Sequence, residues 1–310
     1  MVLGLMHNQT TPRPNFFVVG APKCGTTSVY EYLSQHPDVF MSENKEPEFF
    51  APNLQWRSDC RVVNEEEYLA LFARAGSAKR IGEASTWYLY STEASRRIKA
   101  FAPDAKILVM LRNPVEMCHS RHWHNVRNAE EDLLDFCEAL EAEEDRLQGR
   151  RIPRDISMPD SLYYRSVPRY TEQLQRYFDL FGRDQVLVII FDDFVNDTAG
   201  EYRRIAEFLE IDTHFTPDFV VANSATTRPV IPLARFWKRH WRIRRWIQIA
   251  TPLQFRRRAG RMLGKLLRPP PPLSAIDPEL RRELQVYFAP EVEKLSRLLD
   301  RDLTDWCRTK

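Results

Sequence analysis

Residues 18–28 read VVGAPKCGTTS: an apolar run, a loop bounded by Gly20 and Gly25, and three hydroxyl side chains. A glycine-bounded loop that leads into a helix offers unpaired N–H donors and the positive end of the helix dipole, so it can bind a phosphate-like anion. The common nucleotide-triphosphatase motif G-x-x-x-x-G-K-[ST] places a lysine directly after its second glycine. Here Thr26 follows Gly25, and the only lysine of the segment, Lys23, lies inside the loop. The segment therefore predicts an anion site with its cation in an unusual position.

Other interpretations of this loop use the same residues. The hydroxyls after Gly25 could simply cap an ordinary helix. A phosphatase loop needs an arginine six residues after its cysteine, but Tyr30 holds that place after Cys24. A kinase loop needs a lysine where Thr26 stands. The two enzymatic alternatives fit poorly, whereas simple helix capping stays open on this loop alone.

A second segment, LVMLRNPVEMCHSRHW at 108–123, strengthens the interpretation of an anion site. Arg112 leaves the end of an apolar run, Pro114 suits the first turn of a helix, and Ser120 follows Arg112 by eight residues. That spacing covers the exit from a strand and about two helical turns, so both polar tips can converge on one phosphate. Taken alone, Arg112 could form a surface ion pair and Ser120 could face solvent.

The elements that must position these residues alternate along the chain. Short runs that are apolar on both faces predict parallel strands covered by helices, at 16–20, 106–111 and 186–191. Helical patterns are predicted at 26–36, 114–126, 163–180, 197–210 and 277–306. Alternating strands and helices indicate an α/β fold with a P-loop-like central parallel sheet flanked by helices. Ligands of such sheets bind at the carboxyl ends of the strands, where the glycine loop lies.

Size and composition suit a large soluble domain, with 310 residues of which 43% are hydrophobic and 28% charged. The five cysteines are scattered without a C-x-x-C pair, which argues against a disulfide framework or a structural zinc site and for a reducing compartment. The first residues do not resemble a signal peptide, and no apolar run reaches the roughly 18 residues of a membrane span. We expect a cytoplasmic protein.

Basic residues are concentrated in one part of the chain. Residues 228–268 hold 13 Lys and Arg without any Asp or Glu, so the remainder carries 32 basic against 43 acidic residues, a net of −11. Within it, 234–267 interleaves arginines with tryptophans at helical spacing, which predicts a basic amphipathic helix. Such a helix can pack on the core, lie on an anionic membrane surface, or bind an acidic polymer. Nucleic acid is the weakest of these because no reader motif accompanies it.

Together, GAPKCGTTS and RNPVEMCHS resemble the 5′-phosphosulfate loop and the 3′-phosphate motif of sulfotransferases that use 3′-phosphoadenosine 5′-phosphosulfate (PAPS). SENKEPEFFAP at 42–52 and IGEASTWYLYS at 81–91 resemble segments of the glycan branch of that family, its heparan-sulfate-type and bacterial members. The resemblance implies a single sulfotransferase domain over 1–310. Its expected parts are a PAPS-binding and catalytic core (15–228), a basic amphipathic insertion (229–272) and a C-terminal helical closure (273–310).

The resemblance also implies PAPS as the co-substrate, without a metal ion. A lysine inside the loop can stabilise the bridging oxygen, where negative charge develops as the sulfuryl group leaves, and Lys23 takes that role. The implied cofactor-binding residues are Lys23, Cys24, Gly25, Thr26, Thr27, Ser28, Arg112, Ser120, Tyr163 and Arg228.

The acceptor must lose a proton as it attacks, so a base must lie within hydrogen-bond reach of it. By resemblance to the glycan branch, matching the two phenylalanines of KEPEFF makes Glu46 the base and Glu48 an acceptor-orienting residue at a position where relatives carry His or Gln. On the sequence alone, Glu46 could be a solvated surface carboxylate. His119, His122 and His124 also invite a base or metal reading, but their spacing does not place all three on one helical face.

One departure concerns the fourth segment, where heparan-type relatives carry a lysine after the glutamate and this chain has Ala84 after Glu83. The change removes a cation near the acceptor and weakens the case for a polyanionic, heparan-like substrate. The expected function is sulfuryl transfer from PAPS to a hydroxyl or amine of a sugar or glycolipid. The alternatives are a P-loop kinase acting on a small molecule, and a non-catalytic protein that docks on membranes or glycans.

Overall fold

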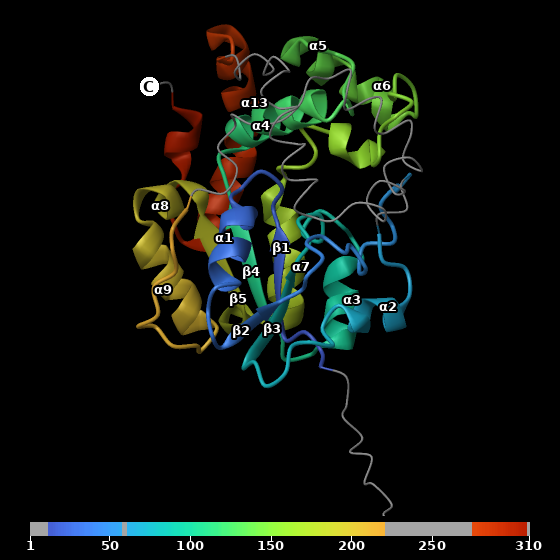
Figure 1. Cartoon of the computed structure of the whole chain (residues 1–310). Coiled ribbons are helices and arrows are strands. Elements are labelled where there is room, and N and C mark those ends of the chain that lie inside the picture. Colours follow the sequence, from blue (N-terminus) through green and yellow to red (C-terminus); the bar gives the residue numbers. More distant parts are fainter. Residues whose placement is uncertain (1–11, 58–60, 221–274, 309–310) are drawn as a thin grey trace, which may run out of the picture.

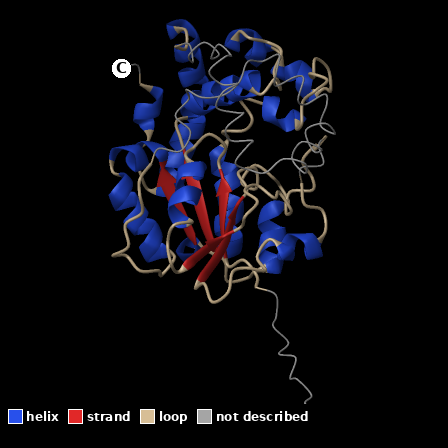
Figure 2. Cartoon of the chain, in the orientation of Figure 1, coloured by secondary structure: helices blue, strands red, loops and turns tan. Residues whose placement is uncertain are grey.

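The computed structural model describes residues 12–57, 61–220 and 275–308, and every structural statement below refers to them. Five parallel strands form one sheet in the order β2-β3-β1-β4-β5 (Figure 2). They are β1 (Phe16–Gly20), β2 (Val39–Met41), β3 (Arg80–Ala84), β4 (Lys106–Leu111) and β5 (Val186–Ile190). The predicted α/β fold with a central parallel sheet is confirmed. The expected insertion at 229–272, including the basic segment 234–267, lies outside the described residues.

Helices cover both faces of the sheet (Figure 1). On one face, α1 shares an aromatic contact with α8, since the rings of Tyr32 and Phe194 lie 6.1 Å apart. On the other face α7 packs against α3, and α13 packs against α7. The helices of these two layers are α1 (Thr26–Leu33), α3 (Ala94–Phe101), α7 (Tyr170–Phe181), α8 (Phe191–Asn196), α9 (Thr198–Phe208) and α13 (Pro278–Leu299). No described helix is both long and apolar enough to cross a membrane.

A further helical group lies at the carboxyl edge of the sheet (Figure 1). β4 leads directly into α4 through Asn113, whose side chain accepts a hydrogen bond from the Val115 N–H, with Pro114 in the first turn. The remaining described helices are α2 (Glu65–Ala70), α4 (Pro114–Arg127), α5 (Phe136–Glu141), α6 (Glu143–Leu147), η1 (Pro159–Leu162), η2 (Arg183–Gln185) and η3 (Thr304–Cys307). The glycine loop and α4 therefore meet at one edge.

Several predicted boundaries were wrong. The helix expected from 163 begins only at Tyr170, because Val167 precedes Pro168 and a residue before proline is disfavoured in the helical region. The pattern at 277–306 breaks at Asp300, which has a φ of 51°, before η3 begins. The helix expected to reach residue 36 ends at Leu33, and the strand expected to reach residue 191 ends at Ile190.

The strands β2 and β3 were not predicted. β2 has only three residues, and β3, with the sequence RIGEA, carries two charged residues and a glycine. Gly82 of β3 lies directly opposite Phe16 of β1, and a Cβ added to Gly82 would lie 2.2 Å from the tip of the fully buried Phe16 ring. Glycine is thus required at position 82 because the Phe16 ring packs directly against the β3 backbone there.

We predict that Gly82→Ala destabilises the fold by about 1–3 kcal/mol, because the added methyl group overpacks a closed core. Denaturant unfolding of the purified variant measures this change. In the Gly82→Ala background, Phe16→Leu is expected to recover part of the loss, although Phe16→Leu alone destabilises by leaving a cavity. An unchanged unfolding midpoint for Gly82→Ala would contradict the close approach.

Candidate active site

The loop between β1 and α1 has a backbone that few residues other than glycine adopt. Gly20, Lys23 and Gly25 have φ values of 150°, 65° and 90°. A Cβ on Gly25 would lie 3.0 Å from the Phe191 ring, so the loop also needs glycine for space. Gly25 caps α1 without a side-chain hydrogen bond. Three residues with hydroxyl groups follow it, Thr26, Thr27 and Ser28. None of these hydroxyl groups forms a hydrogen bond with the described residues, so none of them caps the helix.

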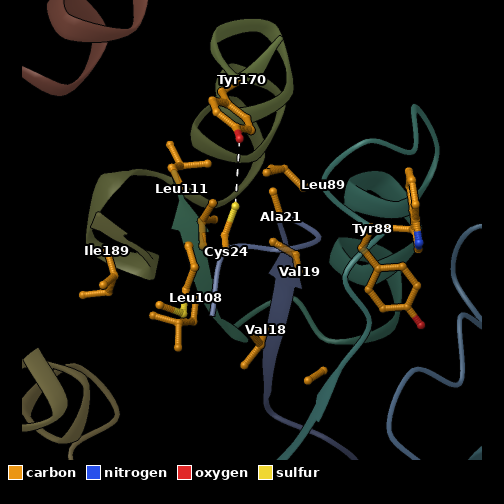
Figure 3. Packing of buried hydrophobic residues seen from close by; sticks show 14 of the residues in the cluster. Val18, Val19, Ala21, Cys24, Tyr88, Leu89, Leu108, Leu111, Tyr170 and Ile189 are labelled. Carbon is orange, nitrogen blue, oxygen red and sulfur yellow. Dashed lines mark hydrogen bonds between the residues drawn. The ribbon is translucent and has the colours of Figure 1, made fainter. Parts of the chain in front are cut away.

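The side chain of Cys24 is buried and points toward the hydroxyl group of Tyr170 (Figure 3). Its Sγ lies 3.9 Å from the hydroxyl oxygen of Tyr170, and burial raises the pKa of the thiol to about 12. The thiol is therefore neutral and separated from any ligand of the loop, and only the main chain of Cys24 can contact one. Tyr170 fastens the loop to α7, a contact that the sequence interpretation missed.

Lys23 stands among positive charges. Burial first, and then the charges of Arg121 and Arg112, lower the pKa of its ammonium group to about 8, while the charge of Glu46 acts in the opposite direction. No ion pair joins Lys23 to a described carboxylate; its Nζ instead lies 3.4 Å from Nδ1 of His124. A cluster of cations without a neutralising carboxylate is the arrangement expected of a site for an anion.

The three histidines of α4 separate into two groups. His124 faces the loop, with its Nε2 lying 2.8 Å from the side-chain nitrogen of Asn128. If Nδ1 accepts a hydrogen bond from the Lys23 ammonium group, Nε2 carries the hydrogen and the Asn128 amide must present its oxygen to it. His119 and His122 instead line a cavity of about 480 Å³ between α4, α5 and the start of α13, away from the loop. The three imidazoles therefore do not share a site, as their spacing predicted.

Arg112 extends from the end of β4 to the loop. Its Nη1 donates a hydrogen bond to the carbonyl oxygen of Lys23 at 3.3 Å, and its guanidinium lies 4.7 Å from the centre of the Phe191 ring. Glu116 is 3.9 Å away but is engaged more closely by Arg281, at 2.7 Å. Ser120 is half-buried in the second turn of α4. The structure thus brings Arg112 to the main chain of the loop at Lys23, and its predicted role with Ser120 at a 3′-phosphate stays a prediction.

Glu46 and Glu48 follow β2 in strained backbone conformations, with φ values of 65° and 52° on either side of Pro47. The Glu46 N–H donates to the carbonyl oxygen of Ala84 at 3.0 Å, which holds the segment against the end of β3. The side chain of Glu46 is 40% exposed and forms an ion pair with Lys45 at 2.5 Å. Glu46 is therefore an accessible carboxylate close to Lys23.

Glu48 has the opposite environment. Its side chain is buried, and neither carboxyl oxygen has a hydrogen-bond partner. Burial first, and then the charges of Glu46 and Glu83, raises the pKa of Glu48 well above its usual value. Since a buried unpaired carboxylate is costly, this environment favours the neutral form of Glu48, which offers an O–H donor.

Beneath Glu48 lies a buried polar network centred on Glu83 of β3. The hydroxyl groups of Tyr68, Ser85 and Tyr88 donate to its carboxylate at 2.7, 2.8 and 3.0 Å. Ser85 also accepts the Glu48 N–H at 3.1 Å, which links the network to the strained segment. Burial raises the pKa of Glu83 to about 7, while these three hydrogen bonds act to lower it. The network fixes the position of Glu48.

One residue of the predicted site, Tyr163, makes its side-chain hydrogen bond to α6 and not to the glycine loop. The hydroxyl group of Tyr163 donates to the carbonyl oxygen of Arg146 at 3.5 Å, next to α6, whereas Tyr170 is the tyrosine that contacts the loop. Arg228 lies outside the described residues. The sequence interpretation also missed Arg121, a buried arginine of α4 whose charge acts on Lys23. In the sequence Arg121 only follows Ser120, and nothing in that pattern indicates that its guanidinium lies close enough to Lys23 to act on its charge.

Comparison with known proteins identifies the fold. The model of the family described as "Sulfotransferase family" matches residues 14–216, which contain the loop, Arg112, Ser120 and both glutamates. The chain belongs to this sulfotransferase family. The crystal structure of a sulfotransferase from Alicyclobacillus acidocaldarius is 34% identical, with a TM-score of 0.73, and the match covers 96% of this chain and 100% of that chain. The predicted sulfotransferase fold is confirmed.

Curated relatives include glycan sulfotransferases. Carbohydrate sulfotransferase 15 of Rattus norvegicus is 27% identical over 248 residues, covering 64% of this chain and 44% of the relative. Heparan sulfate glucosamine 3-O-sulfotransferase 6 of Homo sapiens is 26% identical over 210 residues, covering 65% and 55%. The chain thus spans about half the length of these relatives.

The pKa of Lys23 gives a testable pH dependence. Because an anionic ligand raises the pKa of a neighbouring ammonium group, the protonated form of Lys23 binds the ligand more tightly. Affinity for the desulfonated cofactor, 3′-phosphoadenosine 5′-phosphate (PAP), should be constant below pH 8. Above pH 8 it should fall, approaching about tenfold per pH unit. Calorimetric titration between pH 7 and 9.5 measures this change. Lys23→Arg stays protonated and should remove the dependence, and a flat wild-type profile would contradict the role of Lys23.

Proposed function

We propose that this protein transfers a sulfuryl group from PAPS to a hydroxyl or amine of a carbohydrate or glycolipid acceptor. The observation that carries the proposal is the placement of Lys23, which lies inside the loop among arginines, with no carboxylate ion-paired to it and with the accessible Glu46 close by. Membership of the sulfotransferase family supports the reaction type. The names of two curated relatives state glycan acceptors, and this supports a carbohydrate as the acceptor class.

The cofactor is held by residues of β1, β4 and the helices that follow them. N–H and hydroxyl groups from Gly25 to Ser28 cradle the 5′-phosphate, and Arg112 with Ser120 holds the 3′-phosphate. Tyr163 and Arg228 stay predicted contacts, with Tyr170 supporting the loop from beneath. This assignment of the 5′-phosphate uses N–H and hydroxyl donors at the start of α1 that have no hydrogen-bond partner among the described residues.

The chemical step is an in-line displacement at sulfur. The acceptor oxygen or nitrogen attacks, the bond between sulfur and the bridging oxygen breaks, and PAP leaves with the negative charge. Lys23 stabilises the bridging oxygen as that charge develops. Glu46 takes the acceptor proton, and neutral Glu48 donates a hydrogen bond that orients the acceptor.

Two other functions use the same loop, and nucleotide preference separates them from this proposal. PAP should raise the melting temperature of the protein without magnesium, since ligand binding stabilises the folded state. A small-molecule kinase should respond to Mg-ATP instead, and a protein that only docks on membranes or glycans should respond to neither. Preference for Mg-ATP over PAP would overturn the proposal.

The assignment of the 3′-phosphate predicts a selective loss. Arg112→Ala removes a charge-assisted contact worth about 1.5–3 kcal/mol, so affinity for PAP should fall about tenfold or more. Affinity for adenosine 5′-phosphosulfate, which lacks the 3′-phosphate, should hardly change. Titration calorimetry with both ligands makes the comparison. Equal losses would show that Arg112 supports the loop through the Lys23 carbonyl rather than the 3′-phosphate.

The two glutamates predict different kinetic effects. Glu46→Gln cannot accept a proton, so turnover should fall about 10²–10⁴-fold while PAP affinity stays near wild type. Glu48→Gln keeps a neutral donor in the buried position and should act mainly on the acceptor KM. Steady-state kinetics with sulfur-labelled PAPS separates the effects. Normal turnover in Glu46→Gln with an inactive Glu48→Gln would reverse the two roles.

A further inference from the structure

The cavity of about 480 Å³ between α4, α5 and the start of α13 takes no part in the proposed transfer reaction. It lies on the side of α4 that carries His119 and His122, whereas His124 of the same helix faces the glycine loop. These three helices gather at one end of the molecule (Figure 1). The volume falls within the range of about 300–1,000 Å³ that is typical of small-molecule sites. The cavity is therefore a candidate binding site separate from the proposed active site.

The wall of this cavity is acidic. Four carboxyl groups line it, and its described lining residues include neither a lysine nor an arginine; the four are Asp135, Asp277, Glu279 and Glu283. Asp135 and Asp277 each use Oδ1 to accept N–H groups at the start of α5 and of α13, and no described residue bonds their Oδ2. No described cation forms an ion pair with any of the four. The described part of the chain thus leaves this negative charge without a neutralising partner.

His119 is a buried polar side chain that lines the cavity without a polar partner. It is only 5% exposed, and neither ring nitrogen forms a hydrogen bond with a described residue. Burial lowers the pKa of this imidazole to about 4, so the ring is neutral near pH 7 and one of its nitrogens is an acceptor. A buried acceptor without a partner is costly, and an N–H group of a ligand in the cavity would satisfy it.

His122 adds a second acceptor. Its Nε2 donates a hydrogen bond to the Leu133 carbonyl oxygen at 2.9 Å, which fixes the tautomer and leaves Nδ1 as an acceptor. Burial lowers the pKa of this imidazole as well. Two imidazoles and four carboxyl groups therefore offer acceptors to the cavity, a set that matches a cationic ligand rich in N–H donors.

The cavity also has an apolar lining. Phe136, Ile276 and Leu280 are buried and line it, and the Phe136 ring lies 5.2 Å from both imidazole rings. Leu134, another lining residue, is 67% exposed. Methylene groups pack on such a surface, whereas a bare metal ion does not use it, and the described side chains form no group of three that could hold a metal ion. The ligand should thus combine positive charge with an aliphatic chain.

We propose that this cavity binds a linear polyamine, in which ammonium groups are separated by methylene chains. The carboxyl groups come from two helices, Asp135 from the start of α5 and the other three from the start of α13, so separated ammonium groups can each meet a carboxylate. Such pairs are charge-assisted hydrogen bonds. The methylene chain lies on the apolar lining, and one ammonium group donates to His119. This site does not depend on the proposed sulfuryl transfer.

A lysine side chain carries the same chemistry, an ammonium group on a methylene stem, and basic residues of this chain stand near the cavity in the sequence. Residues 228–268 hold 13 Lys and Arg without any Asp or Glu, and Ala275, which lines the cavity, follows Arg268 by seven residues. A free polyamine and a basic side chain of the chain itself are therefore two sources that the test must separate.

Calorimetric titration of the full chain with spermidine tests the proposal. Wild-type protein should bind one spermidine per chain, and fully acetylated spermidine, which keeps the chain but loses the charges, should not bind. Glu279→Gln with Glu283→Gln should weaken binding about tenfold or more, the scale of a charge-assisted hydrogen bond. The matched control is Glu66→Gln with Glu67→Gln, which removes two exposed carboxylates of α2 that do not line the cavity and should leave the affinity unchanged.

His119 and Cys137 provide two further readouts. His119→Phe keeps an aromatic ring next to Phe136 but offers no acceptor, so it should also weaken spermidine binding about tenfold while the protein stays folded in thermal unfolding. Cys137 is exposed and lines the cavity, so bound spermidine should slow its alkylation, which mass spectrometry of the labelled peptide measures. The exposed glutamate variants decide the question if His119→Phe does not fold.

Four results would overturn the inference: no saturable binding of spermidine, equal binding of the acetylated chain, equal weakening in the two double glutamate variants, or an unchanged alkylation rate of Cys137 at saturation. Tighter binding of spermidine to Lys265→Gln with Arg268→Gln than to the wild type would show that basic side chains of the chain itself compete for the cavity, and would overturn it as well. PAP binding is measured on the same samples, so a failure of the proposed function appears separately, as an absence of PAP binding.

Discussion

Repulsion between positive side chains is the constraint on which the rest of this site depends. Burial first, and then the charges of Arg121 and Arg112, lower the pKa of Lys23, and no described carboxylate forms an ion pair with Lys23. Such a cluster is unfavourable in the free protein, so the fold must hold it in place. The loop does so with three residues at positive φ, the Arg112 hydrogen bond to the Lys23 carbonyl, and Tyr170 packed under Cys24.

The sheet separates two kinds of chemistry along its carboxyl edge. The strands β1 and β4 lead to cations and helix N-termini, whereas β2 and β3 lead to carboxyl groups in strained or buried positions. Hydrogen bonds from two tyrosines and a serine satisfy both oxygens of the Glu83 carboxylate. This network makes the end of the sheet formed by β2 and β3 rigid. α4 connects the halves, since it supplies His124 to the loop and Arg121 to the side of Trp87.

The sequence predicted the parts of the structure that have strong local signals. The apolar runs of β1 and β4, the glycine loop, and Pro114 at the start of α4 each follow from residue type and spacing. β2 and β3 could not be predicted in the same way, because three residues carry no period and RIGEA owes its burial to Phe16 packing over Gly82. Tertiary packing decided these elements.

The same limit applies to the site. Glu46 and Glu48 are two residues apart and of one type, yet one is accessible and the other is buried without a partner, a difference set by Ser85 and Glu83 on another strand. The sequence named Tyr163 as a cofactor contact and gave no reason to choose Tyr170, which contacts Cys24 of the loop from the start of α7. The stacking of Arg121 on Trp87 joins positions 34 residues apart and leaves no local trace.

The burial of Cys24 has a practical consequence for following the loop in solution. Thiolate is the reactive form of cysteine, and the Cys24 thiol is both enclosed and held in its protonated form, whereas Cys137 is exposed on α5. Alkylating reagents will therefore modify Cys137 at once and reach Cys24 only through transient opening of the loop away from α7. The slow labelling of Cys24, once it is resolved from that of Cys118, the other buried thiol of the described residues, thus reports the free energy of that opening without a probe attached to the site itself.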